Sequence, residues 1–234
     1  MPAHPNLIQL TATPFIHAYL VMEADGLTLI DGQLPHNAPY TLKAMARTGL
    51  PLRRVLLTHA HLDHVGCLDA ILTAHPQAEL IVSERAAPFL RGDYTLFPNE
   101  HPQTLDDTRF FSTLQHAPAY TLKDGEHVGS LQMIATPGHS PDHVAWLDTR
   151  DGMLIAGDAF QAIGGLSVIG VMNWLNPLPT WATWNRPLTL DSAIRLRNLQ
   201  PTGLAVGHGG ILANPLGAMD RAIAHAQRVL GHQA

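Results

Sequence analysis

The chain has 234 residues, of which 46% are hydrophobic and 14% charged, so it can bury a core large enough to fold without disulfides. Its formal net charge is −5 and no Lys/Arg cluster interrupts the acidic balance, which argues against nucleic-acid binding. Residues 1–6 lack the basic and apolar regions of a signal peptide. The apolar residues 162–175 are too few, and too interrupted by glycine, to span a bilayer, and a single cysteine allows no internal disulfide. We therefore expect a soluble cytoplasmic protein with no membrane partner.

The first third of the chain predicts short strands and helices in turn. Apolar or alternating runs between turn residues are typical of strands, and periodic runs that end at glycine are typical of helices. The expected strands cover residues 7–10, 15–22, 27–30, 55–57 and 80–82, and the expected helices cover residues 40–47 and 68–74.

The remainder of the chain continues the alternation after an irregular segment. Residues 88–118 mix Pro, Asp and Phe without a clean period and predict short helices and loop. The expected strands cover residues 120–122, 127–128, 131–135, 144–147, 153–155 and 204–206, and the expected helices cover residues 188–199 and 219–230. With no linker or repeat in the sequence, we expect residues 1–234 to form one mixed α/β domain whose sheets are covered by helices.

The strongest chemical signal is the run His59-Ala60-His61-Leu62-Asp63-His64, which directly follows an expected buried strand. In an extended chain residues two apart point the same way, so His59 and His61 can converge on one ion. Asp63 and His64 lie at the expected start of the next helix and can face a second ion. Neutral imidazole and carboxylate groups suit Zn²⁺, and also Fe or Mn.

Three later segments each place one residue of metal-ligand type after a strand and a glycine. They are Thr136-Pro137-Gly138-His139, Ala156-Gly157-Asp158 and Val206-Gly207-His208. Glycine allows a tight turn at a strand end. Alone, each His or Asp is more often a cap or turn residue, but with the first run they make seven ligands. That number suits two metals that share a bridging carboxylate.

Asp31, followed by the His-x-His-x-Asp-His, Gly-His, Gly-Asp and Gly-His motifs, resembles the five-part signature of the metallo-β-lactamase superfamily over residues 31–208. The resemblance implies a four-layer αββα sandwich with the metal site at one edge of the two sheets. It also implies a role for each motif residue: His59, His61 and His139 would bind the first metal; Asp63, His64 and His208 the second; Asp158 would bridge them; and Asp31 would orient the site without binding metal.

The expected chemistry is hydrolysis by a binuclear centre. Two cations lower the pKa of a shared water, and the resulting hydroxide attacks a carbonyl of an ester, lactone or thioester, with Asp63 and Asp158 as catalytic residues. Ala60 stands where flavodiiron oxygen reductases have Glu, which argues against that branch of the superfamily. Gln161 stands where quorum-quenching lactonases have Tyr, which argues against a standard lactonase. The expected cofactors are two divalent ions, zinc before Fe or Mn, and the expected partner is a small-molecule substrate.

Several alternatives stay open. An iron-dependent redox enzyme of the same fold and a non-catalytic metal-binding scaffold would each carry these ligands. His143 could be a hydrogen-bond partner near the site or a structural residue. Phe160, residues 88–118, and the apolar residues 162–175 with Trp174, Trp181 and Trp184 could wall a substrate pocket. The same apolar stretch could instead be core or the contact of a homodimer.

Overall fold

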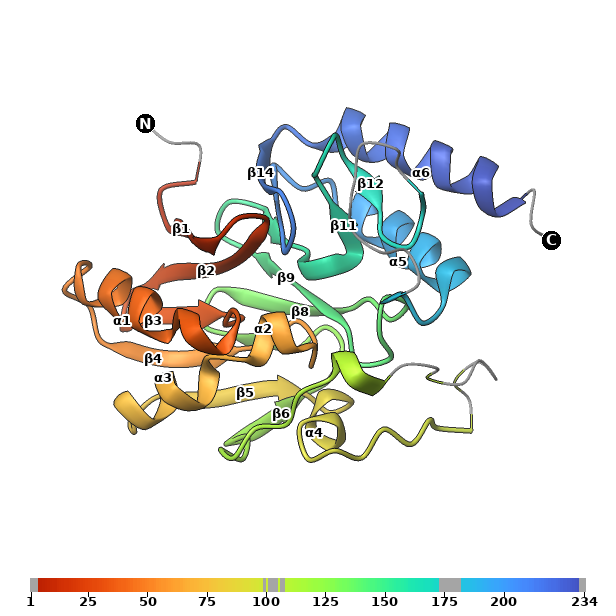
Figure 1. Cartoon of the computed structure of the whole chain (residues 1–234). Helices are drawn as coiled ribbons and strands as arrows, with labels where there is room; N and C mark the ends of the chain where they lie inside the picture. The colour runs from red at the N-terminus through yellow and green to blue at the C-terminus, as the bar shows by residue number, and fades with distance from the viewer. Residues whose placement is uncertain (1–3, 99, 101–104, 106–107, 173–181, 232–234) are drawn as a thin grey trace.

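Two six-stranded sheets stack face to face in the computed structural model, which describes residues 4–98, 100, 105, 108–172 and 182–231 (Figure 1). The first sheet has the strand order β1-β2-β3-β4-β5-β6. Its strands are β1 (Leu7–Thr13), β2 (Ile16–Glu23), β3 (Gly26–Ile30), β4 (Leu52–Leu56), β5 (Glu79–Ser83) and β6 (Tyr120–Leu122). The central strand β3 is buried at every position, which fits its continuous apolar sequence and its parallel neighbour β4.

The second sheet has the strand order β14-β13-β10-β9-β8-β7. Its strands are β7 (His127–Val128), β8 (Leu131–Ala135), β9 (Val144–Asp148), β10 (Met153–Ile155), β13 (Gly203–Val206) and β14 (Gly210–Ala213). A separate pair, β11 (Phe160–Gln161) and β12 (Ser167–Val168), follows β10 in the chain. Sequence patterns did not predict β11, β12 or β14, because two- to four-residue strands beside glycines carry too short a pattern.

Helices lie on the outer faces of both sheets (Figure 1). Those on the side of the first sheet are α1 (Ala38–Ala46), α2 (Leu62–Val65), α3 (Leu68–Ala74) and α4 (Ala86–Phe89). Those on the side of the second sheet are α5 (Arg186–Asn198) and α6 (Leu216–Gly231). Three 3-10 turns complete the described elements: η1 (Pro35–Asn37), η2 (Thr108–Phe110) and η3 (Gly157–Ala159).

Three apolar cores separate these layers and confirm the predicted four-layer αββα sandwich. In the first core, Leu29 and Val55 of the first sheet pack with Ile71 of α3. In the middle core, Trp146 of the second sheet packs between the sheets and is fully buried. In the third core, Leu204 of the second sheet packs with α5 and α6. Burial of apolar surface on both faces of each sheet holds the four layers together.

Strand direction brings several loops to one edge of the sandwich. In the first sheet β3 and β4 are parallel. In the second sheet β10 is parallel to β13 and antiparallel to β9, and β9 is antiparallel to β8, so β8, β10 and β13 run the same way. The loops that follow β8, β10 and β13 therefore leave the same edge of that sheet, and these are the loops that carry His139, Asp158 and His208.

Some expected boundaries change in the structure. Phe15 was predicted to open a strand, but it lies in the β1–β2 turn with a φ of 67°. The irregular segment 88–118 does contain short helical turns, at the end of α4 and at η2. Trp174 and Trp181 lie outside the described residues. No helix in the described part of the chain is long and apolar enough to cross a membrane, and a cytoplasmic location stays a prediction.

Candidate metal centre

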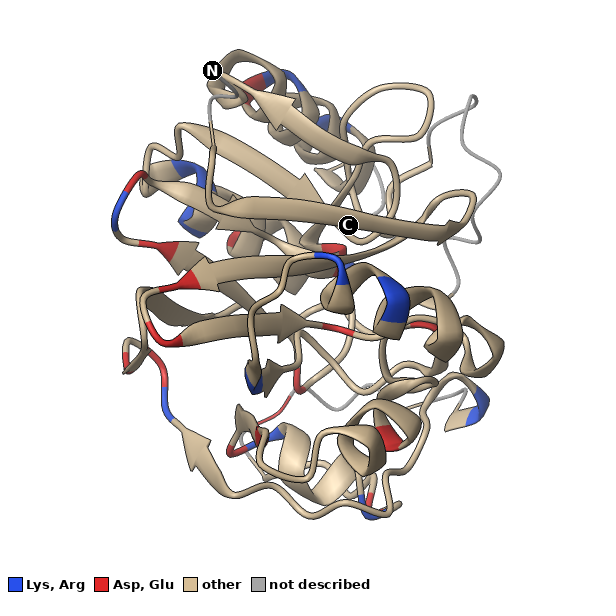
Figure 2. Ribbon diagram, turned by 90° about the vertical axis from the view of Figure 1, so that its left-hand side faces the viewer, with Lys and Arg blue, Asp and Glu red and all other residues tan. Residues whose placement is uncertain are grey.

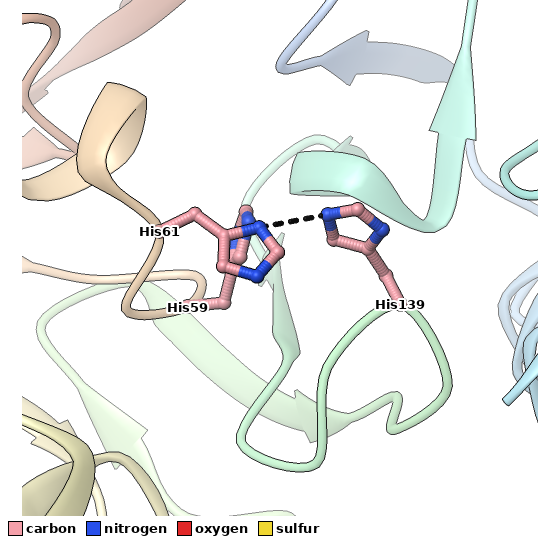
Figure 3. A group of neighbouring side chains, drawn as sticks. All are labelled: His59, His61 and His139. Carbon is pink, nitrogen blue, oxygen red and sulfur yellow. Dashed lines mark hydrogen bonds between the residues drawn. The ribbon is translucent and has the colours of Figure 1, made fainter. Parts of the chain in front are cut away.

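The seven predicted ligands come together at the shared edge of the sheets in three overlapping groups, of which two share no residue and the third, His59, His64 and Asp158, links them. The nitrogens of His59, His61 and His139 lie within 4.8 Å of one another. Figure 3 shows His59 and His61 projecting from one loop toward His139 on another, with His61 Nδ1 and His139 Nε2 3.1 Å apart. These three side chains form the first group, and all three are buried.

The second group consists of Asp63, His64 and His208, whose ligand atoms also lie within 4.8 Å of one another. His208 Nε2 lies 3.4 Å from Asp63 Oδ2, and His64 Nε2 lies 3.8 Å from the same oxygen. Asp63 and His64 are adjacent on α2, and His208 comes from the loop after β13 in the other sheet. The site therefore bridges both sheets.

Asp158 lies between the two groups. Its Oδ2 is 3.5 Å from His139 Nε2 of the first group and 3.1 Å from His208 Nε2 of the second. Its Oδ1 is 3.4 Å from His64 Nε2. This carboxylate thus reaches both groups at once, which is the position that a bridging ligand needs.

Hydrogen bonds from the outer nitrogens orient the imidazoles. Asp31 accepts from His64 Nδ1 at 2.8 Å and from the Thr58 hydroxyl at 2.7 Å, and Thr58 Oγ1 lies 3.0 Å from His59 Nδ1. His208 Nδ1 donates to the carbonyl of Phe15 at 2.7 Å. When the rings are neutral and the outer nitrogens hold the protons, the inner nitrogens present lone pairs to the cluster.

Three buried atoms of the cluster lack hydrogen-bond partners among the described residues: His59 Nε2, His64 Nε2 and Asp158 Oδ1. Unsatisfied buried polar atoms are costly, and they are rare unless a ligand, ion or water satisfies them. These are also donor atoms of the type that Zn²⁺, Fe and Mn prefer. The residues present therefore fit a divalent metal centre.

Burial and charge set different protonation states in the two groups. Burial lowers the pKa of His61 to about 4 and holds the pKa values of His59 and His139 well below the ordinary value. These imidazoles are neutral at pH 7, as metal ligands must be. Burial also disfavours charge on His208, but Asp158 outweighs it and raises the pKa of His208 to about 9.

The same balance acts on His64, where burial is outweighed by Asp158, Asp63 and Asp31, which raise the pKa of His64 well above its ordinary value. Burial alone would raise the pKa of Asp158, but His208 and His64 hold it well below the ordinary range. Carboxylates that favour a proton on these imidazoles also favour a metal cation beside them. Metal binding at this group should therefore release protons.

Asp31 and Gly207 show how tightly the backbone is built around the cluster. Asp31 has a φ of 61°, a conformation that is costly for a residue with a Cβ atom, yet it aims its carboxylate at both Thr58 and His64. Gly207 lies so close to Asp158 that a Cβ atom there would overlap Asp158 Oδ1 and lie 2.7 Å from His64 Cε1. Sequence reasoning missed Thr58 and the Phe15 carbonyl: the signal for Thr58 was its place beside His59, and a backbone carbonyl has none.

His143 proves to be a partner of the site. Its Nε2 accepts a hydrogen bond from the Asp158 backbone N–H at 3.0 Å, and its Nδ1 lies 3.1 Å from the Thr136 carbonyl oxygen. It does not belong to either ligand group. Its ring is buried, and burial lowers its pKa to about 3, so it stays neutral.

The residues expected to line a substrate pocket lie in different environments in the structure. Phe160 is fully buried in the core between the second sheet and its helices, so its assignment to a pocket wall was wrong. Trp184 and Phe97 line a cavity of about 660 Å³ together with His143, although none of the seven predicted ligands lines it. Phe111 of segment 88–118 packs on His61, with ring centroids 4.7 Å apart.

Comparison with known proteins gives a consistent result. The Metallo-beta-lactamase superfamily matches residues 13–208. The uncharacterized protein YobT of Bacillus subtilis (strain 168) is 44% identical over 91% of each chain, and the probable metallo-hydrolase YflN of the same organism is 26% identical over 88% of this chain and 83% of its own. The crystal structure of TTHA1623 in a di-iron-bound form is similar with a TM-score of 0.65 and 26% identity, covering 90% of this chain and 96% of that one.

Proposed function

The chain belongs to the metallo-beta-lactamase superfamily, and we propose from this membership and the site geometry that it is a binuclear metal-dependent hydrolase. The observation that carries the proposal is the position of Asp158, within 3.5 Å of histidines from both ligand groups. The proposed substrates are small molecules with an ester, lactone or thioester carbonyl. This activity agrees with the name of the relative YflN, a probable metallo-hydrolase.

The proposed ligand assignment follows the two groups. His59, His61 and His139 would hold the first metal, Asp63, His64 and His208 would hold the second, and Asp158, which lies close to histidines of both groups, would serve both. Zinc is the proposed metal because imidazole nitrogens and carboxylate oxygens are among the ligands that it favours. When bound, the metals supply Lewis acidity that polarises the carbonyl and lowers the pKa of water.

The chain's own residues keep these ligands in place and handle protons. Asp31 holds His64 and, through Thr58, His59 in the tautomers that present Nε2 to the centre. Asp63 is about 29% exposed at its side chain, whereas Asp158 is buried. Asp63 is thus the carboxylate that can reach solvent, and we assign it the transfer of a proton between the site and bulk water.

Metal analysis followed by a substrate panel tests the proposal. Protein grown in unsupplemented medium should contain two equivalents of metal per chain, with zinc predominant. It should hydrolyse at least one generic ester, lactone or thioester and lose this activity on chelation. A metal-loaded protein that hydrolyses none of the three classes would contradict the proposal.

Single substitutions at the ligands test the assignment itself. His61→Ala removes a ligand of the first group, and Asp158→Ala removes the contact shared by both groups. Each should abolish turnover, because the residual groups cannot hold both metals in position. If either variant retains full activity with the most rapidly hydrolysed substrate of the panel, the assigned site is wrong.

An iron-dependent redox enzyme is the second candidate, and one observation favours it. TTHA1623, which matches nearly the whole chain in fold, was solved in a di-iron-bound form. Histidine and carboxylate ligands accept iron as well as zinc. Iron in the purified protein, together with oxygen- or thiol-dependent turnover and no hydrolysis, would establish this alternative in place of the first.

A further inference from the structure

The adjacent residues Asp142 and His143, between β8 and β9, touch two different ligand loops. Asp142 Oδ2 accepts the backbone N–H of Ala60, which lies between His59 and His61, at 2.9 Å. His143 Nε2 accepts the backbone N–H of Asp158 at 3.0 Å. One dipeptide thus connects the loop that carries the first histidines to the loop that carries the central carboxylate.

From this geometry we infer that Asp142 and His143 are positioning residues that clamp the two ligand loops at a fixed separation and so set the relative positions of the two metals. The inference rests on the proposed metal centre. Neither residue belongs to a ligand group, and neither takes part in the proposed hydrolysis. We call this dipeptide the clamp.

Hydrogen-bond chemistry fixes the state of His143. The donor from Asp158 is a backbone N–H, so His143 Nε2 must accept and carries no proton. The neutral ring then has its proton on Nδ1, which lies 2.8 Å from the Thr136 hydroxyl oxygen and 3.1 Å from the Thr136 carbonyl oxygen, so it donates to Thr136. His143 is therefore an acceptor anchored to the end of β8, the strand that leads to His139, which ties a third ligand loop into the same network.

The clamp itself is held on both sides. The Ser83 hydroxyl, at the end of β5, donates to the Asp142 carbonyl oxygen at 3.3 Å. Val144 N–H, next to His143, donates to the Thr58 carbonyl oxygen at 2.8 Å. Both clamp side chains are only about 1% exposed, so water cannot easily replace their hydrogen bonds. These contacts anchor the clamp, which directly precedes β9 of the second sheet, to β5 and to the residues after β4 of the first sheet.

Burying a carboxylate at Asp142 is unfavourable for folding alone, which supports a positional role. Burial raises its pKa to about 6 despite the nearby Ser140 hydroxyl. Neither Asp142 Oδ1 nor Ser140 Oγ has a well-aligned hydrogen-bond partner in the described chain. The carboxylate is thus kept at a cost, and its satisfied oxygen serves the ligand loop through Ala60.

The test uses metal binding rather than turnover. Zinc affinity is measured by competition with a chromophoric chelator, and ligand geometry is followed in the visible spectrum of the cobalt-loaded protein. His143→Leu and Asp142→Ala each remove one acceptor. We expect each to weaken zinc binding about 10- to 100-fold and to alter the cobalt spectrum. The double variant should bind zinc only slightly less tightly than the single variant with the lower zinc affinity, because one broken connection already frees the loops.

Conservative and matched variants separate a clamp from general destabilisation. His143→Gln and Asp142→Asn keep an acceptor and should bind zinc nearly as tightly as the natural chain. Asp148→Ala is the control, because Asp148 is a buried acid at the far end of β9, the strand that follows the clamp, where it accepts hydrogen bonds from Arg150. It should lower thermal stability and leave zinc affinity and the cobalt spectrum unchanged.

Each outcome decides one claim. If the natural chain binds neither zinc nor cobalt, the proposed metal centre fails. If it binds both but His143→Leu and Asp142→Ala bind equally well, or if Asp148→Ala weakens binding as much as they do, the clamp alone is overturned. Should the first two variants not fold, hydrogen exchange in the natural chain decides: slow exchange of the Ala60 and Asp158 amides supports the clamp, and fast exchange of both refutes it.

Discussion

At the scale of single residues, this site shows imidazoles held by hydrogen bonds at one nitrogen and directed inward at the other. Asp31 is the most connected of the holding groups, because it accepts three hydrogen bonds, from the Thr58 backbone N–H, the Thr58 hydroxyl and His64 Nδ1. Its left-handed backbone conformation is maintained by those three hydrogen bonds. The candidate ligand types are thus a local feature of the sequence, whereas the orientation of these side chains depends on residues distant in sequence.

Asp142 makes a residue-scale prediction about pH. Its pKa is raised by burial to about 6, so the folded state disfavours the ionised form that the unfolded chain adopts above about pH 4. Stability from this group is therefore greatest at low pH and is lost as the pH rises through 6. The cost reaches about 3 kcal/mol at about pH 7.5, from about 1.4 kcal/mol per pKa unit.

Asp142→Asn removes this ionisation while keeping an acceptor for Ala60. The difference in unfolding free energy between the variant and the natural chain should increase in favour of the variant by roughly 1–2 kcal/mol as the pH rises from about 5 to about 7.5. Urea unfolding of both zinc-loaded proteins at a series of pH values measures the difference. A constant difference across this range would show that Asp142 has an ordinary pKa.

Gly207 makes a second prediction at this scale. A methyl group there would overlap Asp158 Oδ1 and crowd His64. Gly207→Ala should therefore displace the central carboxylate and weaken metal binding by at least about 10-fold, with little loss of secondary structure by circular dichroism. Gly231→Ala is the control, because nothing lies near a Cβ at Gly231. Normal metal affinity in Gly207→Ala would mean that the centre tolerates a methyl group beside Asp158.

At the scale of elements, α5 supports the loop that carries His139. Asn185 caps the helix, since its side chain accepts from Leu188 N–H at 3.1 Å, and its own backbone N–H donates to the Gly138 carbonyl oxygen at 2.8 Å. Ser192 of the same helix donates to the Pro137 carbonyl oxygen at 2.7 Å. The start of this helix and the ligand loop are therefore one connected unit.

Asn185→Ala should remove the cap and lower the free energy of unfolding by about 1 kcal/mol. For a chain of this size that corresponds to a fall in Tm of roughly 2–4 °C. Asn185→Ser keeps a capping oxygen and should retain most of the stability. Differential scanning calorimetry compares the two, and an equal loss in both would exclude the cap as the cause.

At the scale of the whole molecule, the candidate metal centre joins loops from both sheets at one edge. Bound metals would therefore stabilise the packing of the two sheets as well as the site. Charge is otherwise dispersed: Figure 2 shows Lys and Arg scattered among several elements and interspersed with Asp and Glu. The dispersed charge is consistent with the expected small-molecule partner, which stays a prediction, as does a homodimer.

Metal removal tests this role. A metal ion whose free concentration is about 1,000 times its Kd adds about 4 kcal/mol to the free energy of unfolding. Chelation followed by dialysis should thus lower Tm on the order of 10 °C, and zinc should restore it. His61→Ala serves as the comparison, because it should show a smaller response to chelation. An unchanged Tm after verified metal loss would mean that the centre does not couple the sheets.

The identity and order of the candidate ligands could be predicted from the amino-acid sequence. His59 to His64, His139, Asp158 and His208 follow buried strands, and strand periodicity together with the family signature predicted the αββα fold and all seven candidate ligands. These features are readable because alternation and motif spacing are local properties of the chain. Helix α3 was predicted with its observed bounds for the same reason.

The surroundings of the ligands, in contrast, depend on tertiary packing. The hydrogen bond from His208 to the Phe15 carbonyl spans 193 positions, and the one from Ala60 to Asp142 spans 82. The burial of Phe160 in the core, the short strands β11, β12 and β14, and the clamp likewise had no local pattern. Contacts between distant segments arise from sheet stacking, which a one-dimensional spacing does not encode. Spacing therefore predicted the candidate ligands, and packing determined how these side chains are held.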